Sequence, residues 1–163
     1  MSVAFRREGD EEHLEPKFEI PIPPGPNRVT PRGLALIGVR VAAVEAQIAE
    51  YSSRSDDDPQ LKAAKRDLRY WQTRQITAEL VPPPSGETVE FGTRVTFRLN
   101  GKERELGIVG DDEADPASGL VSFSAPLARA LIGAEVGEML EFGGKDDAIE
   151  VLAIEVLAIA VLG

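Results

Sequence analysis

Apolar residues spaced three and four positions apart form the first regular pattern of the chain, between residues 34 and 51. Its members are Leu34, Ile37, Val41, Val44, Ile48 and Tyr51. This spacing places them on one side of a helix, as in the heptads of a coiled coil. Thr30 and Pro31 come just before the run and suit the N-cap and first position of a helix. The pattern therefore predicts a helix that begins near residue 30.

A second run with the same spacing follows a polar break at residues 52–59, which is rich in Ser, Asp and Pro. Its members are Leu61, Ala64, Leu68, Trp71, Gln75 and Ala78. One helix alone would leave its apolar side in water, so we expect the two to pack as an antiparallel coiled-coil hairpin over residues 30–81. Arms of about 21 residues would each be roughly 30 Å long.

Beyond residue 88 the pattern changes to a period of two, which is typical of strands. Apolar and polar side chains alternate from residue 93 to residue 99, and Asn100-Gly101 then predicts a type I′ turn into a return strand at 103–109. Residues 120–123, 136–142 and 149–159 are further predicted strands. We expect them to form one antiparallel sheet.

A short helix is predicted to cover this sheet. Ser124 suits its N-cap, Pro126 its first turn and Gly133 its C-terminal stop. The chain is therefore expected to be an α+β protein, with a helical hairpin followed by a small sheet domain.

Proline-rich segments mark the expected domain boundaries. Residues 1–29 combine an acidic cluster with four closely spaced prolines and are predicted to be a flexible tail. The hairpin follows at 30–81, and Pro82-Pro83-Pro84 opens a linker at 82–87. The sheet domain is expected to occupy residues 88–163.

Composition narrows the function. The chain has 163 residues, a net charge of −10, no Cys, and one His, which lies in the predicted tail. Residues 82–163 carry 6 basic and 15 acidic side chains, whereas residues 30–81 carry 8 and 7. Such acidity disfavours binding of free DNA, and no nucleophile–base pair is visible. We therefore expect no catalytic activity of its own. No apolar run is long enough to span a bilayer, so we expect a soluble protein. The absence of Cys suits a reducing cytoplasm.

An acidic loop, Ile108-Val109-Gly110-Asp111-Asp112-Glu113-Ala114-Asp115, stands between two predicted strands. Its alternating carboxylates would suit Ca²⁺, but the Gly and distal Glu of an EF-hand loop are missing. The alternative is a docking loop that presents carboxylates to arginines of a partner. We favour the docking loop.

The acidic loop is one of several motifs that resemble the GreA/GreB family of bacterial transcript-cleavage factors. The others are Thr30-Pro31-Arg32-Gly33, Phe91-Gly92-Thr93-Arg94-Val95-Thr96, the segment from Ser124 to Gly133, and Glu135-Val136-Gly137-Glu138. The resemblance extends over about residues 28–160 and is densest from 91 to 142. The Pro-rich tail is additional.

This resemblance implies a C-terminal domain of FKBP-like fold that docks on RNA polymerase near its secondary channel. The coiled coil would enter the channel and place acidic tip residues at the catalytic Mg²⁺, so that the polymerase cleaves its own backtracked RNA. The implied docking residues are Asp111, Asp112, Glu113, Ser124, Pro126, Leu127 and Arg129. We expect a monomer with no cofactor of its own, which shares only the polymerase's Mg²⁺.

Asp56, Asp57 and Asp58 are the candidate tip residues. The family's tip motif, roughly Gly-Asp-Leu-(Ser/Lys)-Glu-Asn, is absent. The hairpin is also about twenty residues shorter in total, and about ten residues fewer in each arm remove roughly 15 Å of reach. The triplet therefore has a second interpretation, in which it is a solvated turn that caps the following helix.

A basic stripe on the second helix consists of Lys62, Lys65, Arg66 and Arg69, which share one helix face. The resemblance implies that this stripe contacts the 3′ end of the nascent RNA inside the polymerase. The alternative is a solvated face that pairs with Glu45 and Glu50 across the hairpin.

Two other functions compete with cleavage stimulation. The shortened hairpin favours a regulator or inhibitor of the Rnk type, which would bind the secondary channel without supporting cleavage. The third candidate is a prolyl isomerase of the FKBP type, which needs an aromatic-lined pocket. The sheet domain offers only Phe91, Phe97, Phe123 and Phe142 for it, and some of these are needed for the core.

Overall fold

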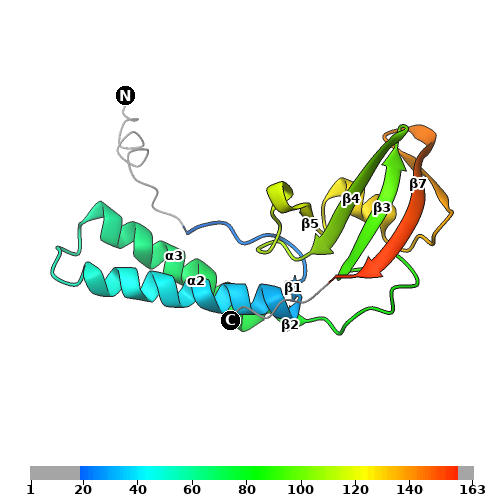
Figure 1. Cartoon of the computed structure of the whole chain (residues 1–163). Coiled ribbons are helices and arrows are strands. Elements are labelled where there is room, and N and C mark those ends of the chain that lie inside the picture. Colours follow the sequence, from blue (N-terminus) through cyan, green and yellow to red (C-terminus); the bar gives the residue numbers. More distant parts are fainter. Residues whose placement is uncertain (1–18, 158–163) are drawn as a thin grey trace, which may run out of the picture. The chain divides into compact units, whose positions relative to one another are not determined.

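The computed structural model describes residues 19–157 (Figure 1). Within this range the chain divides into two compact units. The helical unit consists of residues 19–24 and 38–76, and the sheet unit consists of residues 25–37 and 77–157. Helices and sheet are thus both present, and the α+β class is confirmed. No described helix is long and apolar enough to cross a membrane.

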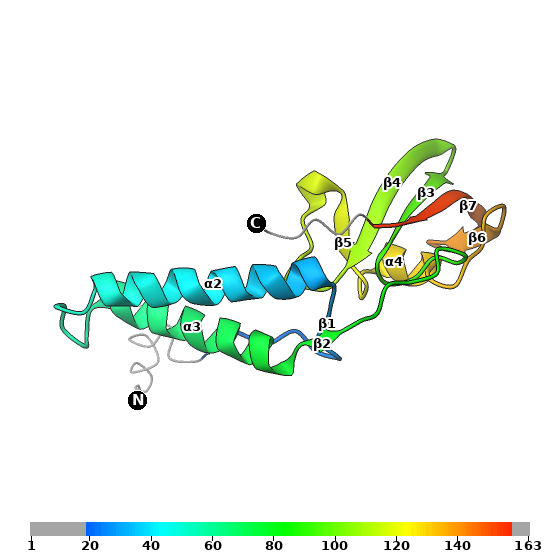
Figure 2. The same cartoon turned by 60° about the horizontal axis from the view of Figure 1, so that its bottom comes forward.

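Two helices dominate the helical unit: α2 (Pro31–Glu50), whose first residues belong to the sheet unit, and α3 (Pro59–Thr77). They lie side by side and run in opposite directions in both views (Figures 1 and 2). The predicted seams supply the buried side chains Val41, Leu61 and Ala64. Most other seam residues are half-buried because each helix packs against a single helical neighbour. The exceptions are Ile37, which is fully buried, and Gln75, which is exposed although the seam predicted it to face inward.

Five strands form the sheet of the sheet unit. They are β3 (Thr93–Leu99), β4 (Lys102–Val109), β5 (Leu120–Ser122), β6 (Met139–Phe142) and β7 (Lys145–Val156), in the spatial order β5-β4-β3-β7-β6. The pairs β3–β4, β3–β7 and β6–β7 are antiparallel, as predicted.

The β4–β5 pair is parallel, so the sheet is mixed and the prediction of a purely antiparallel sheet was wrong. The chain between these strands turns twice. It first turns in the acidic loop after Gly110, and it turns again where Asp115 and Leu120 exchange backbone hydrogen bonds of 2.8 and 3.1 Å, around the 3₁₀ helix η1 (Pro116–Ser118). Two reversals return β5 to the direction of β4.

The Asn100-Gly101 turn is confirmed. Both residues have positive φ, 53° and 86°, as a type I′ turn requires, and Leu99 pairs with Lys102 across it. Alternation along β3 buries Val95 and Phe97 completely. These side chains form the core together with residues of β4, β7 and the short helix α4 (Pro126–Leu131).

The N-terminus of α4 differs from the prediction. Its N-cap is Ala125, which has no polar side-chain atom and therefore makes no side-chain capping bond. The extended backbone of Ala125 is the conformation favoured before Pro126. Ser124 is therefore one residue too early to cap. The helix ends at Leu131, and Gly133 follows with a positive φ of 95°, in keeping with its predicted role as a stop.

A small parallel sheet was not predicted. It pairs β1 (Arg28–Val29) with β2 (Glu79–Leu80) in the sheet unit. Residues 28–29 are therefore a strand and not part of a flexible tail. The rest of the predicted tail up to residue 18 lies outside the described residues.

Candidate functional site

The acidic loop begins at Gly110, which passes directly against β1. A Cβ atom at this position would lie 2.2 Å from the backbone oxygen of Arg28, so only glycine fits. The amides of Glu113 and Ala114 then donate to the Gly110 carbonyl, each at 3.2 Å, and this turns the chain sharply. The loop is therefore held at its first residue by a backbone contact.

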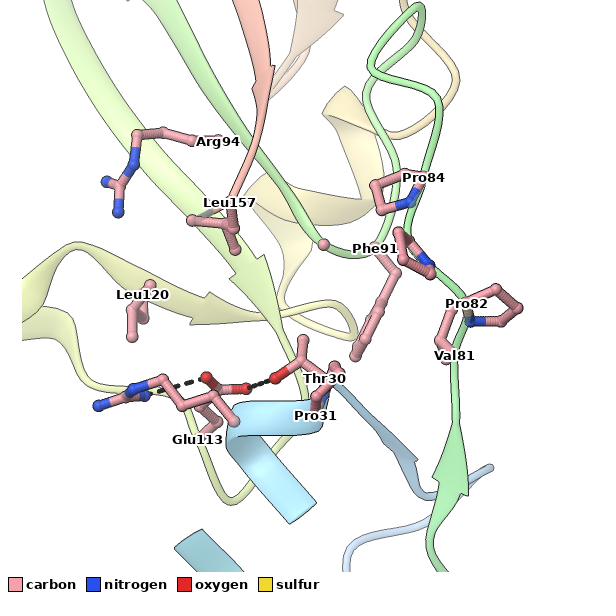
Figure 3. Close-up of a pocket in the computed structure, with 13 residues that line it drawn as sticks. Thr30, Pro31, Val81, Pro82, Pro84, Phe91, Arg94, Glu113, Leu120 and Leu157 are labelled. Atoms are coloured by element: carbon pink, nitrogen blue, oxygen red, sulfur yellow. Dashed lines mark hydrogen bonds and ion pairs between the residues drawn. The ribbon is translucent and has the colours of Figure 1, made fainter. Parts of the chain in front are cut away.

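Glu113 points inward from this loop, toward the first turn of α2 (Figure 3). Its carboxylate accepts a hydrogen bond of 2.6 Å from Thr30 Oγ1 and pairs with Arg32 Nη1 at 3.0 Å. The side chain is only 5% exposed. A carboxylate this deeply buried needs such partners, because burial of an unpaired charge is costly.

The same contact explains the Thr30-Pro31-Arg32-Gly33 motif. Thr30 Oγ1 accepts a hydrogen bond of 2.9 Å from the Gly33 amide, which confirms Thr30 as the N-cap of α2. A Cβ at Gly33 would lie 2.8 Å from Glu113 Oε1, so the glycine makes room for the carboxylate. Two motifs that looked separate in the sequence thus form one buried cluster.

Glu113 consequently does not belong to an exposed docking surface, contrary to the expectation from the sequence. Its carboxylate instead binds Thr30 and Arg32 within the sheet unit. Asp111 and Asp112 are half-buried, which leaves part of each accessible.

The structure brings Asp111 and Ser124 together. Asp111 Oδ1 accepts hydrogen bonds from Ser122 Oγ at 2.5 Å and from Ser124 Oγ at 3.2 Å. Two of the predicted segments therefore meet at one place. Pro126 and Arg129 are exposed on α4, whereas Leu127 packs against the core. We call Asp111, Asp112, Ser124, Pro126 and Arg129 the loop–helix surface.

A cavity of about 140 Å³ lies beside the Glu113 cluster in the sheet unit (Figure 3). The predicted linker prolines Pro82–Pro84 form one wall, and Leu120 and Leu157 contribute to the lining. Phe91 is the one aromatic side chain among the residues that line it. This cavity does not match the aromatic-lined pocket that a prolyl isomerase needs.

At the turn between α2 and α3, the three aspartates have different roles. Asp58 Oδ1 accepts hydrogen bonds from the amides of Gln60 and Leu61 at 2.8 and 3.2 Å, and Asp58 Oδ2 pairs with Arg54 at 3.4 Å. Asp58 is thus a helix cap, as the second interpretation of the triplet holds. Asp56 and Asp57 are exposed. The described residues contain no group of three or more His, Cys, Asp or Glu placed to hold a metal ion.

The basic stripe lies on α3 with its side chains exposed or half-buried. Neither Glu45 nor Glu50 forms an ion pair with it among the described residues, so the pairing across the hairpin that the alternative interpretation requires is not made. Arg69 instead pairs with Glu19 through two hydrogen bonds, of 2.5 Å from Nε and 2.9 Å from Nη2. These bonds lower the pKa of the Glu19 carboxyl and raise that of the Arg69 guanidinium.

Sequence reasoning missed two notable groups. One is the buried Thr30–Arg32–Glu113 cluster, whose members lie about 80 positions apart and show no common pattern. The other is Arg74, a basic residue on α3 whose side chain is only 1% exposed. Arg74 has the same helical register as the seam residues Ala64 and Trp71, at steps of ten and three, and this is the signal that places it on the inner face.

The comparisons with known proteins agree with these motifs. The family model "Transcription elongation factor, GreA/GreB, C-term" matches residues 83–158. The transcription elongation factor GreA of Caulobacter vibrioides is 40% identical over 130 residues, which cover 69% of this chain and 82% of that protein. GreA of Sinorhizobium medicae is 45% identical over 75 residues, 44% of this chain and 48% of that protein.

Among solved structures, the chain is similar to GreA factor homolog 1 (Gfh1) of Thermus thermophilus, with 21% identity and a TM-score of 0.35. The match covers 80% of this chain and 99% of that one. The Caulobacter match extends over most of both chains at an identity well above chance similarity. The chain therefore belongs to the GreA/GreB family of transcription elongation factors.

Proposed function

We propose that this protein binds RNA polymerase at its secondary channel and stimulates cleavage of backtracked RNA by the polymerase's own active site. The observation that carries the proposal is the loop–helix surface, in which hydrogen bonds join the acidic loop to the segment before α4. Members of the family are elongation factors, and a preformed acidic surface is what such a factor needs in order to dock.

The chemistry of this surface favours a basic partner. Asp111 is held by two serine hydroxyls, and Asp112 beside it is half exposed. A carboxylate held as Asp111 is can accept a hydrogen bond from arginine without losing much side-chain entropy on binding. The surrounding segment 82–163 has 15 acidic and 6 basic side chains, so its net charge is −9 and its field attracts a positive surface.

For the cleavage step, we propose that Asp56 and Asp57 approach the catalytic Mg²⁺ of the polymerase. Magnesium binds oxygen ligands and is commonly held by one or two carboxylates while it keeps several waters. Two exposed carboxylates on a turn between helices fit that requirement. Asp58 is assigned a different role, because its oxygens cap α3 and pair with Arg54.

A transcript-cleavage assay on backtracked polymerase complexes tests this proposal. We expect the wild-type chain to stimulate cleavage and the double variant Asp56→Asn/Asp57→Asn to lose most of the stimulation, because an amide is a poorer magnesium ligand than a carboxylate. Glu45→Gln/Glu50→Gln removes the same charge from α2 and should retain activity. Equal activity of the two double variants would contradict a metal role for the aspartates.

A second candidate is a factor that binds the channel without supporting cleavage. The observation that favours it is the length of α2, whose 20 residues reach only about 30 Å. In that case the wild-type chain would compete with another secondary-channel factor for polymerase and yet give no cleavage. The same assay, run with a binding competition, separates the two functions.

A further inference from the structure

The segment that precedes the sheet unit lies against α3 in the helical unit. We call residues 19–24 the arm. Glu19, Ile20 and Ile22 of the arm share a shallow hollow with the C-terminal half of α3, where the facing side chains are Arg69, Tyr70, Gln72, Thr73 and Ile76. The arm therefore covers the part of α3 that follows the basic stripe, beginning at Arg69.

The polar part of this contact is the Glu19–Arg69 pair. Both guanidinium nitrogens Nε and Nη2 donate to the carboxylate, one to each oxygen. This is the paired arrangement in which arginine binds carboxylates and phosphates alike. Both side chains are about half exposed, 58% for Glu19 and 53% for Arg69, so an external ligand can compete for the arginine.

The charges around the pair favour such competition. Arg69 is the last member of the basic stripe, and Lys65 in the same stripe is exposed. The arm thus brings the Glu19 carboxylate to the basic stripe of a protein whose net charge is −10.

We propose that the arm is an internal competitor for the basic stripe, in which Glu19 occupies on Arg69 the place that a phosphate of RNA would take. Binding of RNA along the stripe then requires release of the arm. This inference rests on the proposed function, and on the contact with RNA that the family resemblance implies for the stripe. It adds a regulatory element, because anything that holds the arm elsewhere would increase access to the stripe.

Binding of a short fluorescent oligouridylate to the full chain, measured by anisotropy at low salt, tests the competition without polymerase. Glu19→Gln keeps the arm but removes its charge, and we expect RNA affinity to rise about two- to fivefold, the range of an exposed ion pair. Glu45→Gln removes the same charge from exposed α2 and serves as the matched control. The difference between the two should shrink as salt is raised.

Equal RNA affinity of Glu19→Gln and Glu45→Gln, or no measurable binding by Glu19→Gln, would overturn the proposal. A second measurement follows the arm itself by NMR, through the backbone amide signals of Ile20 and Ile22. We expect RNA, or the variant Arg69→Gln, to move both signals toward their positions in a synthetic peptide of residues 1–24. Signals that stay in place while RNA binds would also overturn it.

The outcome is separable from that of the proposed function. A chain that fails to stimulate cleavage in the polymerase assay but passes both tests above would retain the competing arm. A chain that stimulates cleavage while Glu19→Gln behaves like Glu45→Gln would keep the proposed function and lose the arm mechanism.

Discussion

At the scale of single residues, Glu113 shows how a buried charge can define a local structure. One of its carboxylate oxygens accepts a hydrogen bond from the hydroxyl of Thr30, which caps α2, and the other pairs with the guanidinium of Arg32 in the first turn of that helix. The contact costs desolvation, which its partners offset. A carboxylate that looked like a docking group in the sequence therefore serves to hold the acidic loop on the start of a helix.

Glu113→Ala is expected to lower the free energy of unfolding by about 2–3 kcal/mol. Breaking a buried ion pair lowers stability more than breaking an exposed one. The loss is moderated here because the Arg32 side chain is 35% exposed and water can solvate it in part. Urea denaturation measures the change. Glu103→Ala, an exposed carboxylate on β4, should change stability by less than about 0.5 kcal/mol. Equal losses in the two variants would show that the cluster contributes little.

At the scale of elements, most of the regular structure could be predicted because it depends on local patterns. The heptad runs found both helices, and Asn100-Gly101 found the tight hairpin through its backbone preference. The parallel placement of β5 could not be found in this way, since it depends on two successive turns within the β4–β5 connection. The β1–β2 pair was missed because two-residue strands carry no periodicity.

The candidate site was predictable to a similar extent. The resemblance to a known family pointed to the acidic loop and to the segment after Ser124, and the structure joins them through Asp111. It did not reveal that Glu113 faces inward, because burial depends on a partner some 80 positions away. Nor did it separate Asp58 from its neighbours, since capping depends on where the helix begins.

Two glycines of the sheet unit should respond differently to substitution. A Cβ at Gly101 would have no neighbouring atom within 4 Å. Gly101→Ala should therefore lower the free energy of unfolding only through the strain of a positive φ in a residue with a Cβ, by about 1–2 kcal/mol. Gly110→Ala drives a Cβ into the backbone of Arg28, and the loop or β1 must move. We expect Gly110→Ala to lose more unfolding free energy than Gly101→Ala. The reverse order in a denaturation experiment would contradict the contact.

At the scale of the whole molecule, charge and family membership lead to one testable statement about docking. Asp112→Arg reverses a charge on the loop–helix surface, and we expect it to weaken binding to RNA polymerase at least about tenfold. Glu103→Arg makes the same charge change on an exposed position of β4 and is the control. Binding is measured by surface plasmon resonance, with thermal midpoints compared to exclude unfolding. Similar affinities for both variants would place the docking surface elsewhere.

The Glu113 cluster also has a consequence for how such a chain can evolve. Gly33 leaves room for the carboxylate, Thr30 donates to it and Arg32 balances its charge. Once Glu113 is replaced by a smaller, neutral residue, selection no longer requires glycine at position 33 or a basic residue at position 32. Substitutions in residues 30–33 and at position 113 should therefore occur together in related chains. A hybrid chain that takes these two segments from different relatives should have a buried carboxylate without its partners, or the partners without the carboxylate.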